Sequence, residues 1–251
     1  MTQRAHAARQ FLARMAGVGQ ESGPQPSIPR TVCIACTEVL PVTHAAVMLM
    51  AHPDDRHMLH ASSAAMTEVE ELQYTLGEGP SVEAFTSGGP VLVRDISVPD
   101  ARWPVFSSQP HPPEVRALYA FPLHQGGIGI GVLSLAREEP SPLTDDERAE
   151  GLLTADAVAL TMLKYLHDRD AAYGSEAIEA AAHMWDQMKV DEAIGMVMAQ
   201  IRGSTAMALA RLRATAFVRG QSLPEVAYQV VNRTLRFDPE PPEPGREHGL
   251  W

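Results

Sequence analysis

The clearest hydrophobic pattern of the chain lies near its C-terminus, between Val190 and Phe237. Three successive runs repeat apolar residues at i, i+3, i+4 and i+7, which is the spacing of one buried helix face. These positions are Val190, Ala193, Ile194, Val197, Met198 and Ile201 in the first run, Ala208, Leu209, Leu212 and Ala216 in the second, and Leu223, Val226, Ala227, Val230 and Val231 in the third. The pattern therefore predicts three short helices that share a core.

Residues at the helix boundaries support this prediction. Gly203 and Gly220 follow the first and second runs, where a left-handed C-terminal cap favours glycine. Ser204 can accept a backbone hydrogen bond as the N-cap of the second helix. Ser222 and Glu225 have the spacing of a capping box at the start of the third helix, with proline in its first turn.

The second of these helices is also apolar on the side away from its core face. Met207, Ala210, Ala214 and Phe217 lie there, with an arginine on each flank, Arg211 and Arg213. One interpretation is a helix that is buried on both sides or packs on a partner. The other is a nucleic-acid surface, since small residues allow close approach, arginine binds phosphate and an aromatic ring stacks on an unpaired base.

Upstream, residues 27–170 alternate between helix and strand patterns. Predicted helices are Thr31–Leu40, Met66–Thr75, Val82–Thr86, a start of helix at Val115–Tyr119, and a long helix from the capping box at Thr144 to about His167. Predicted strands are Ala45–Ala51, Met58–Ser63, Val91–Val93, Ala120–His124 and Gly129–Ala136. Residues 1–15 predict a short amphipathic helix, and Gly17–Arg30 reads as a linker rich in Gly, Pro and Ser.

The order of elements in residues 28–170 resembles that of a GAF domain. The likeness rests on the segments LQYTLGEGPSVEAF, VRDI, RWPVF, AFPLHQGGIGIGVLSLA and LTDDE. It implies an α+β fold in which helices flank a central antiparallel sheet, with a pocket above the sheet that often holds a small ligand. The turn Leu76–Pro80 borders that pocket in the family, so Glu78 either touches a ligand or only shapes the turn.

The C-terminal segment resembles the ANTAR domain, the all-α, three-helix RNA-binding module of bacterial antitermination regulators. AIGMVMAQ, ALARLRATAF and SLPEVAYQVV carry the likeness, in that order. Relatives often have lysine where this chain has Ile194. A GAF domain followed by ANTAR implies a transcription antitermination regulator whose RNA stem-loop is bound by Arg211, Arg213, Arg219, Ala210, Ala214 and Phe217.

These resemblances divide the chain into five parts. We expect an N-terminal extension and linker (1–27), a GAF sensor domain (28–170), a connecting helix (171–189), an ANTAR domain (190–237) and a proline-rich, disordered tail (238–251).

Charge separates the C-terminal segment from the rest of the chain. The net charge is −11, from 20 basic and 31 acidic residues. Residues 185–237 hold seven of the basic and four of the acidic residues, or +3, which leaves −14 for the remainder. An acidic body repels nucleic acid and leaves the C-terminal segment as the expected contact, although +3 is also ordinary scatter for a segment of this length.

Composition also predicts the compartment. No apolar run reaches the ~18 residues of a membrane span, and arginines at 4, 9 and 14 interrupt the region where a secretory signal would be apolar. Two cysteines fit a reducing compartment. We therefore expect a cytoplasmic protein without a membrane partner.

Several clusters of reactive residues are weak candidates for chemistry. Cys33 and Cys36 have no second ligand pair, so we expect buried, unreactive thiols. A solvated turn, rather than a metal site, is suggested by His52, His57 and His60 beside Asp54 and Asp55. As a catalytic nucleophile and its base, Cys36 and His44 would lack an orienting carboxylate. The glycines at 126, 127, 129 and 131 precede a strand, so they favour a hairpin over a phosphate loop. We expect no catalytic site, no metal and no cofactor.

Three functions remain open. The first is a sensor-regulator that binds a stem-loop in nascent RNA, with an unknown small ligand at the GAF domain. It would act as a homodimer, paired through Ile178, Ala182, Trp185, Met188 and Val190. The second is a ligand-binding or methionine sulfoxide-reducing GAF protein whose C-terminal helices serve dimerisation. The third gives those helices a DNA-binding role as a helix-turn-helix.

Overall fold

The computed structural model describes residues 6–17, 27–52, 55–125, 128–171 and 177–237, without side-chain detail for 51–55 and 167–188. The chain divides into two compact units, Met1–Gln187 and Met188–Trp251. In chain order the elements are α1 (His6–Gly17), α2 (Ile28–Val39), β1 (His44–His52), β2 (Asp55–Ala61), α3 (Ala64–Leu76), α4 (Pro80–Ser87), β3 (Val91–Val93), α5 (Pro104–Ser108), β4 (Ala117–Gln125), β5 (Ile128–Arg137), α6 (Asp145–Ala171), α7 (Ala177–Ile201), α8 (Thr205–Arg219) and α9 (Leu223–Val231).

The five strands that the structure describes form one antiparallel sheet in the order β2-β1-β5-β4-β3. This confirms the predicted sheet and its strands. The predicted helical start at Val115–Tyr119 is wrong, because β4 begins at Ala117. Neighbouring side chains there pack on opposite sides, Leu118 with one core and Tyr119 with the other. That alternation belongs to a strand buried on both faces.

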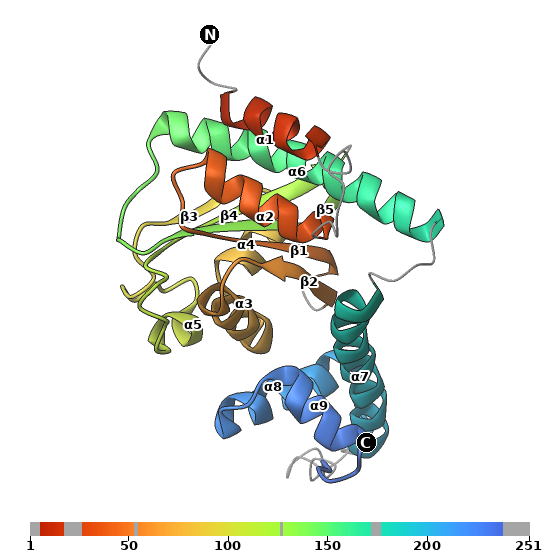
Figure 1. Cartoon of the computed structure of the whole chain (residues 1–251). Helices are drawn as coiled ribbons and strands as arrows, with labels where there is room; N and C mark the ends of the chain where they lie inside the picture. The colour runs from red at the N-terminus through yellow and green to blue at the C-terminus, as the bar shows by residue number, and fades with distance from the viewer. Residues whose placement is uncertain (1–5, 18–26, 53–54, 126–127, 172–176, 238–251) are drawn as a thin grey trace, which may run out of the picture. The chain divides into compact units, whose positions relative to one another are not determined.

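Helices cover both faces of the sheet (Figure 1). Helices α1, α2 and α6 lie on one face, and α3, α4 and α5 lie on the other. Each face has its own hydrophobic core, with Phe11, Tyr119 and Met162 in the first and Met66, Phe106 and Leu118 in the second. The sheet is therefore a central layer whose strands are apolar on both sides.

Helix α1 is part of this unit. Ala7, Ala8 and Phe11 are buried against its neighbours. The carboxylate of Glu150 on α6 accepts hydrogen bonds from the backbone N–H groups of His6 and Ala7, both at 3.0 Å. A negative group at a helix N-terminus satisfies backbone donors that have no partner within the helix.

The second unit contains the predicted three helices. Its buried side chains are Val190, Ala193, Val197, Ile201, Ala208, Leu209, Leu212, Ala216, Leu223, Val226, Ala227, Val230 and Leu235. Ser204 accepts from the backbone of Met207, Ser222 and Glu225 form the capping box, and Gly220 is left-handed with φ 60°. The sequence pattern therefore identified most of the core and most of the caps, although Ile194, Met198 and Val231 are only half-buried and the buried Leu235 was not predicted.

The predicted left-handed cap at Gly203 is wrong. Arg202, not Gly203, is left-handed, with φ 54°. Helix α7 ends at Ile201, so the first residue beyond it is Arg202, and the Gly203 N–H closes the helix by bonding to Met198 O at 3.3 Å. The left-handed position thus comes one residue earlier than the glycine suggested.

Some predictions fall outside the described residues. These are the tail 238–251, Gly126 and Gly127, Asp54, and the side chains of His52, Asp55, Ile178, Ala182, Trp185 and Met188. Of the helices that the structure describes, none has the length and apolar character needed to cross a bilayer.

Candidate functional site

A buried polar cluster lies between the sheet and the α3–α4 pair. Gln73 Nε2 donates to Glu70 Oε2 at 3.0 Å, and Ser81 Oγ donates to Glu70 Oε1 at 3.0 Å. Ser81 Oγ also lies 3.0 Å from Ser134 Oγ on β5. All four residues are at most 1% exposed. The cluster therefore joins α3, α4 and β5 inside the core.

The turn between α3 and α4 shapes this cluster. The backbone N–H of Ser81, in the first turn of α4, donates to Gln73 Oε1 at 2.8 Å. Gly79 has φ 138°, and a Cβ there would lie 2.5 Å from the same Gln73 oxygen. Glycine is required at this position because the backbone crosses directly over the Gln73 side chain.

Electrostatics in the cluster centre on Glu70. Complete burial raises the pKa of its carboxyl, while hydrogen bonds from Ser134, Ser81 and Gln73 and the charge of Arg56 act in the opposite direction. Arg56 is 5% exposed, and its guanidinium lies 4.6 Å from the centre of the Tyr74 ring. The net effect raises the pKa of Glu70.

The cluster was missed from the sequence, although a signal was present. Gln73 falls on the same stripe of α3 as Met66 and Val69, so a polar residue occupies a core position of a predicted helix. A buried polar residue has to find hydrogen-bond partners. The pattern could therefore have indicated a buried network, but not its members Ser81 and Ser134.

Glu78 holds a neighbouring loop. Its Oε1 accepts from the backbone N–H groups of Val105 and Phe106, at 2.7 and 2.8 Å. These amides belong to the first turn of α5, a short helix that the sequence analysis did not identify. The carboxylate thus connects the α3–α4 turn to α5, and contact between Glu78 and a ligand stays a prediction.

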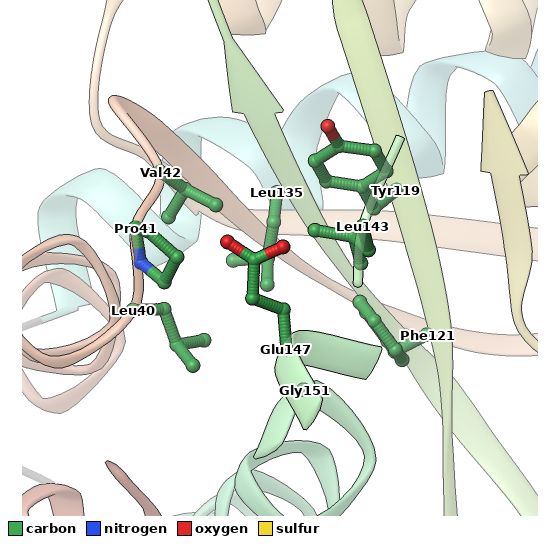
Figure 2. A pocket seen from close by; sticks show the side chains of 9 residues that line it. All are labelled: Leu40, Pro41, Val42, Tyr119, Phe121, Leu135, Leu143, Glu147 and Gly151. Carbon is green, nitrogen blue, oxygen red and sulfur yellow. The ribbon is translucent and has the colours of Figure 1, made fainter. Parts of the chain in front are cut away.

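A small cavity lies on the opposite face of the sheet (Figure 2). It measures about 10 Å³ and is lined by Leu40, Pro41, Val42, Tyr119, Phe121, Leu135, Leu143, Glu147 and Gly151. The Glu147 carboxylate reaches into this ring of residues, where it bonds to Arg137 at 2.7 Å. Burial alone would raise the pKa of Glu147, but hydrogen bonds from Thr144 and Arg137 lower it. The space suits one water molecule at most, so it is a packing gap.

A larger, open groove of about 400 Å³ borders the edge strand β3. It is lined by Leu92, Val93, Arg94, Asp95, Val98, Pro99, Asp100 and Arg102. Asp95 and Asp100 each form an ion pair with an arginine, Arg116 and Arg102. The guanidinium of Arg102 lowers the pKa of Asp100 through a hydrogen bond. This groove has the volume of a small-molecule site.

The other candidate residues do not form a reactive site in the described part of the chain. Cys33 and Cys36 are fully buried, and burial raises the pKa of Cys33 to about 12, as expected for unreactive thiols. His57 and His60 lie half-buried on β2 rather than in a turn. Among the described residues no group of three or more His, Cys, Asp or Glu could hold a metal ion. Gly129 and Gly131 lie in the antiparallel β4–β5 pair, as predicted.

In the second unit, helix α8 presents an apolar surface. We define the α8 outer face as Met207, Ala210, Ala214, Phe217 and Val218, all exposed. Met207 is 47% exposed, Phe217 45% and Val218 82%. Val218 was missed from the sequence, although helical periodicity places it between Ala214 and Arg211.

The predicted RNA-binding arginines differ in their surroundings. Arg219 is exposed and donates to Gln229 Oε1 of α9 at 3.0 Å. Arg211 and Arg213 are half-buried at the flanks of the outer face. Ile194, where relatives often have lysine, is also half-buried, on α7. Five of the six predicted residues, Ala210, Arg211, Arg213, Ala214 and Phe217, thus lie on or beside one face of α8, whereas Arg219 lies on the side that faces α9.

Several solved structures are similar to part of this chain. The GAF domain of a phosphoenolpyruvate-protein phosphotransferase from Coxiella burnetii is 17% identical, with 66% of this chain and 99% of that chain covered and a TM-score of 0.47. The corresponding domain from Acinetobacter is 11% identical, with 67% and 95% covered and a TM-score of 0.48. Free methionine-R-sulfoxide reductase from Neisseria meningitidis, in complex with its substrate, is 14% identical, with 66% and 93% covered and a TM-score of 0.42.

No curated protein matches the chain. The family model of the GAF domain matches residues 26–162, which is more than half of the chain. These residues include the whole antiparallel sheet and the helices α2 to α5, together with most of α6. The protein therefore belongs to the GAF domain family.

Proposed function

We propose that this protein is a signal-responsive regulator that binds a stem-loop in nascent RNA and promotes transcription antitermination. The observation that carries the proposal is the α8 outer face, where exposed small and aromatic side chains lie between Arg211 and Arg213. Sequence-specific RNA recognition uses unpaired bases that stack on aromatic rings, together with arginines that hold phosphates. A stem-loop presents both unpaired bases, in its loop, and phosphates along its backbone.

In this proposal the residues have separate roles. Phe217 stacks on a loop base, and Ala210 and Ala214 let the RNA approach the helix closely. Arg211, Arg213 and Arg219 hold phosphates or base edges. Ile194 replaces a lysine of ANTAR relatives, so this chain recognises RNA with one cation fewer on α7.

The GAF unit is the sensor in this scheme. A small ligand binds there, the open groove beside β3 being one available space. The protein acts as a homodimer in the cytoplasm, where nascent RNA is accessible, and it catalyses no reaction. RNA bound to residues 190–237 of the C-terminal unit forms a stabilised antiterminator structure, so that a terminator cannot form.

A second function is favoured by the apolar character of the same face. Exposed Met207, Phe217 and Val218 also suit a protein partner. In that case the C-terminal helices serve dimerisation or bind duplex DNA, and the protein is a small-molecule-binding GAF protein without RNA affinity.

Fluorescence anisotropy separates these functions. The probe is a pool of RNA hairpins with a fixed stem and a randomised loop, measured at several salt concentrations because phosphate contacts are salt-dependent. We expect the wild type to bind hairpins more tightly than duplex DNA. Arg211→Ala combined with Arg213→Ala should weaken binding about tenfold or more.

The matched control is Arg9→Ala combined with Arg148→Ala, two exposed arginines of the first unit that do not line the groove beside β3. This variant should bind like the wild type. Equal hairpin binding by the Arg211/Arg213 variant would remove the role given to those residues. Preference for duplex DNA, or no nucleic-acid binding at all, would favour the second function.

A further inference from the structure

We propose that Arg202 and Arg233 contact RNA phosphates at one end of the C-terminal unit, outside the α8 outer face. The inference rests on the proposed RNA-binding function and adds a second contact surface to it. Among the described residues these are the only non-glycine residues with positive φ, at 54° and 61°.

The two arginines occupy equivalent places at helix ends. Arg202 follows Ile201, the last residue of α7, and Arg233 follows Asn232, the C-cap residue of α9. In each case the next backbone N–H reaches back five residues, from Gly203 to Met198 O at 3.3 Å and from Thr234 to Gln229 O at 2.9 Å. This is the hydrogen-bond pattern of a helix end whose left-handed residue is usually glycine.

Arginine is an unfavourable choice for this backbone. A residue with a Cβ is less stable in the left-handed conformation than in the right-handed one. A residue in a costly conformation suggests that its side chain has a function. The alternative is that each arginine stabilises the negative end of its helix. A basic residue next to the left-handed position could supply that stabilisation without itself adopting the unfavourable left-handed conformation.

Both side chains are available to a ligand. Arg202 and Arg233 are exposed, and within the part of the chain that the structure describes neither guanidinium has a hydrogen bond or ion pair. Arg219, in contrast, donates to Gln229. Free guanidinium groups are suited to bidentate contacts with phosphate.

The two helix ends are connected to each other. The backbone N–H of Phe237 donates to Gln200 Oε1 at 2.7 Å, and Leu235 is buried. This bond fixes the segment after α9, which contains Arg233 and the exposed Arg236, to the last turn of α7, which precedes Arg202. The segments that carry Arg202 and Arg233 are thus joined by this bond, and their cationic side chains fit the charged backbone of a nucleic acid rather than its bases.

The test compares charge with backbone conformation. The variant Arg202→Gly/Arg233→Gly removes both cations. It also removes the steric cost of the left-handed backbone, because glycine has no Cβ. With the hairpin pool described above, we expect about tenfold weaker binding and a slope of log Kd against log salt that falls by about 1 per arginine. Loss should be uniform across loop sequences, and urea unfolding should show equal or higher stability of the C-terminal unit.

Arg202→Lys/Arg233→Lys is the second variant, since it keeps the charges and should retain most of the affinity and of the salt slope. Unchanged affinity and slope in the glycine variant, while the wild type binds hairpins, would overturn this inference alone. A wild type that binds no hairpin would overturn the proposed function and this inference together. A wild type that prefers duplex DNA would assign the two arginines to DNA and also contradict the inference.

Discussion

Glu70 is an ionisable group in a fully enclosed position on α3. Its hydrogen bonds to Gln73 and Ser81 and the proximity of Arg56 reduce the cost of charging it, but burial has the larger effect and raises its pKa. A glutamine has the shape of the protonated acid and can use Ser134 as an acceptor. Glu70→Gln therefore mimics the protonated form, which burial stabilises relative to the charged form.

This pKa shift makes stability depend on pH. The folded state binds the Glu70 proton more tightly than the unfolded state, so the associated stabilisation is complete below the ordinary glutamate pKa and is lost as pH rises towards the raised value. We expect wild-type stability to decline relative to Glu70→Gln between these pH values, as measured by urea unfolding. Glu68→Gln, exposed on the same helix, is the control and should run parallel to the wild type. Parallel curves for Glu70→Gln and wild type would contradict the prediction.

At the scale of elements, two helix glycines show how packing overrides intrinsic preference. Gly151 on α6 faces the sheet, and a Cβ there would lie 2.5 Å from the Phe121 ring. Gly195 on α7 has no atom within 4 Å of the corresponding position. The first glycine allows α6 to approach β4 closely, whereas the second lies on an open helix surface.

The two alanine variants should therefore have opposite effects. Gly151→Ala should reduce the free energy of unfolding of the GAF unit by about 1–3 kcal/mol, because the added methyl group overpacks the core. Gly195→Ala should raise that of the C-terminal unit by up to about 1 kcal/mol through helix propensity. Thermal and urea unfolding would measure both. Combining Gly151→Ala with Phe121→Leu should recover part of the loss, and an equal loss in the double variant would argue against the contact.

For the whole molecule, the exposed side of α6 suggests how two copies associate. Leu152, Leu153 and Leu160 are 39%, 38% and 56% exposed and lie on one side of the helix, within an arc of about 100° that also contains the exposed Asp156. Exposed leucines of this kind can pack against the same face of a second copy around a two-fold axis. It offers the proposed homodimer an interface within the described part of the chain.

Sedimentation velocity over a range of concentrations tests this interface. We expect the wild type to be a dimer and Leu153→Lys/Leu160→Lys to be a monomer, because buried unpaired lysines oppose association. Val98→Lys is the control, since Val98 is 58% exposed on the loop between β3 and α5. A dimer that persists in the double variant would place the interface elsewhere.

Much of the fold could be predicted because its signals are local. Apolar spacing identified the three C-terminal helices and the five strands, and Ser204, Ser222 and Glu225 marked helix starts within a few residues of the amides they cap. The resemblance to GAF domains matches the family found for residues 26–162. Arg211, Arg213 and the small residues of α8 lie on or beside one face, since helical periodicity alone decides which residues share it, but Arg219 lies on the side of α9.

Tertiary structure decided the features that depend on residues far apart in the chain. Ser134 meets Ser81 only because β5 lies beneath α4, and Gly151 is required only because Phe121 of β4 crosses α6. Periodicity and capping act over a few residues of chain and are readable in sequence. Burial and close contact arise from the assembled sheet and its helices, and no short segment contains that information.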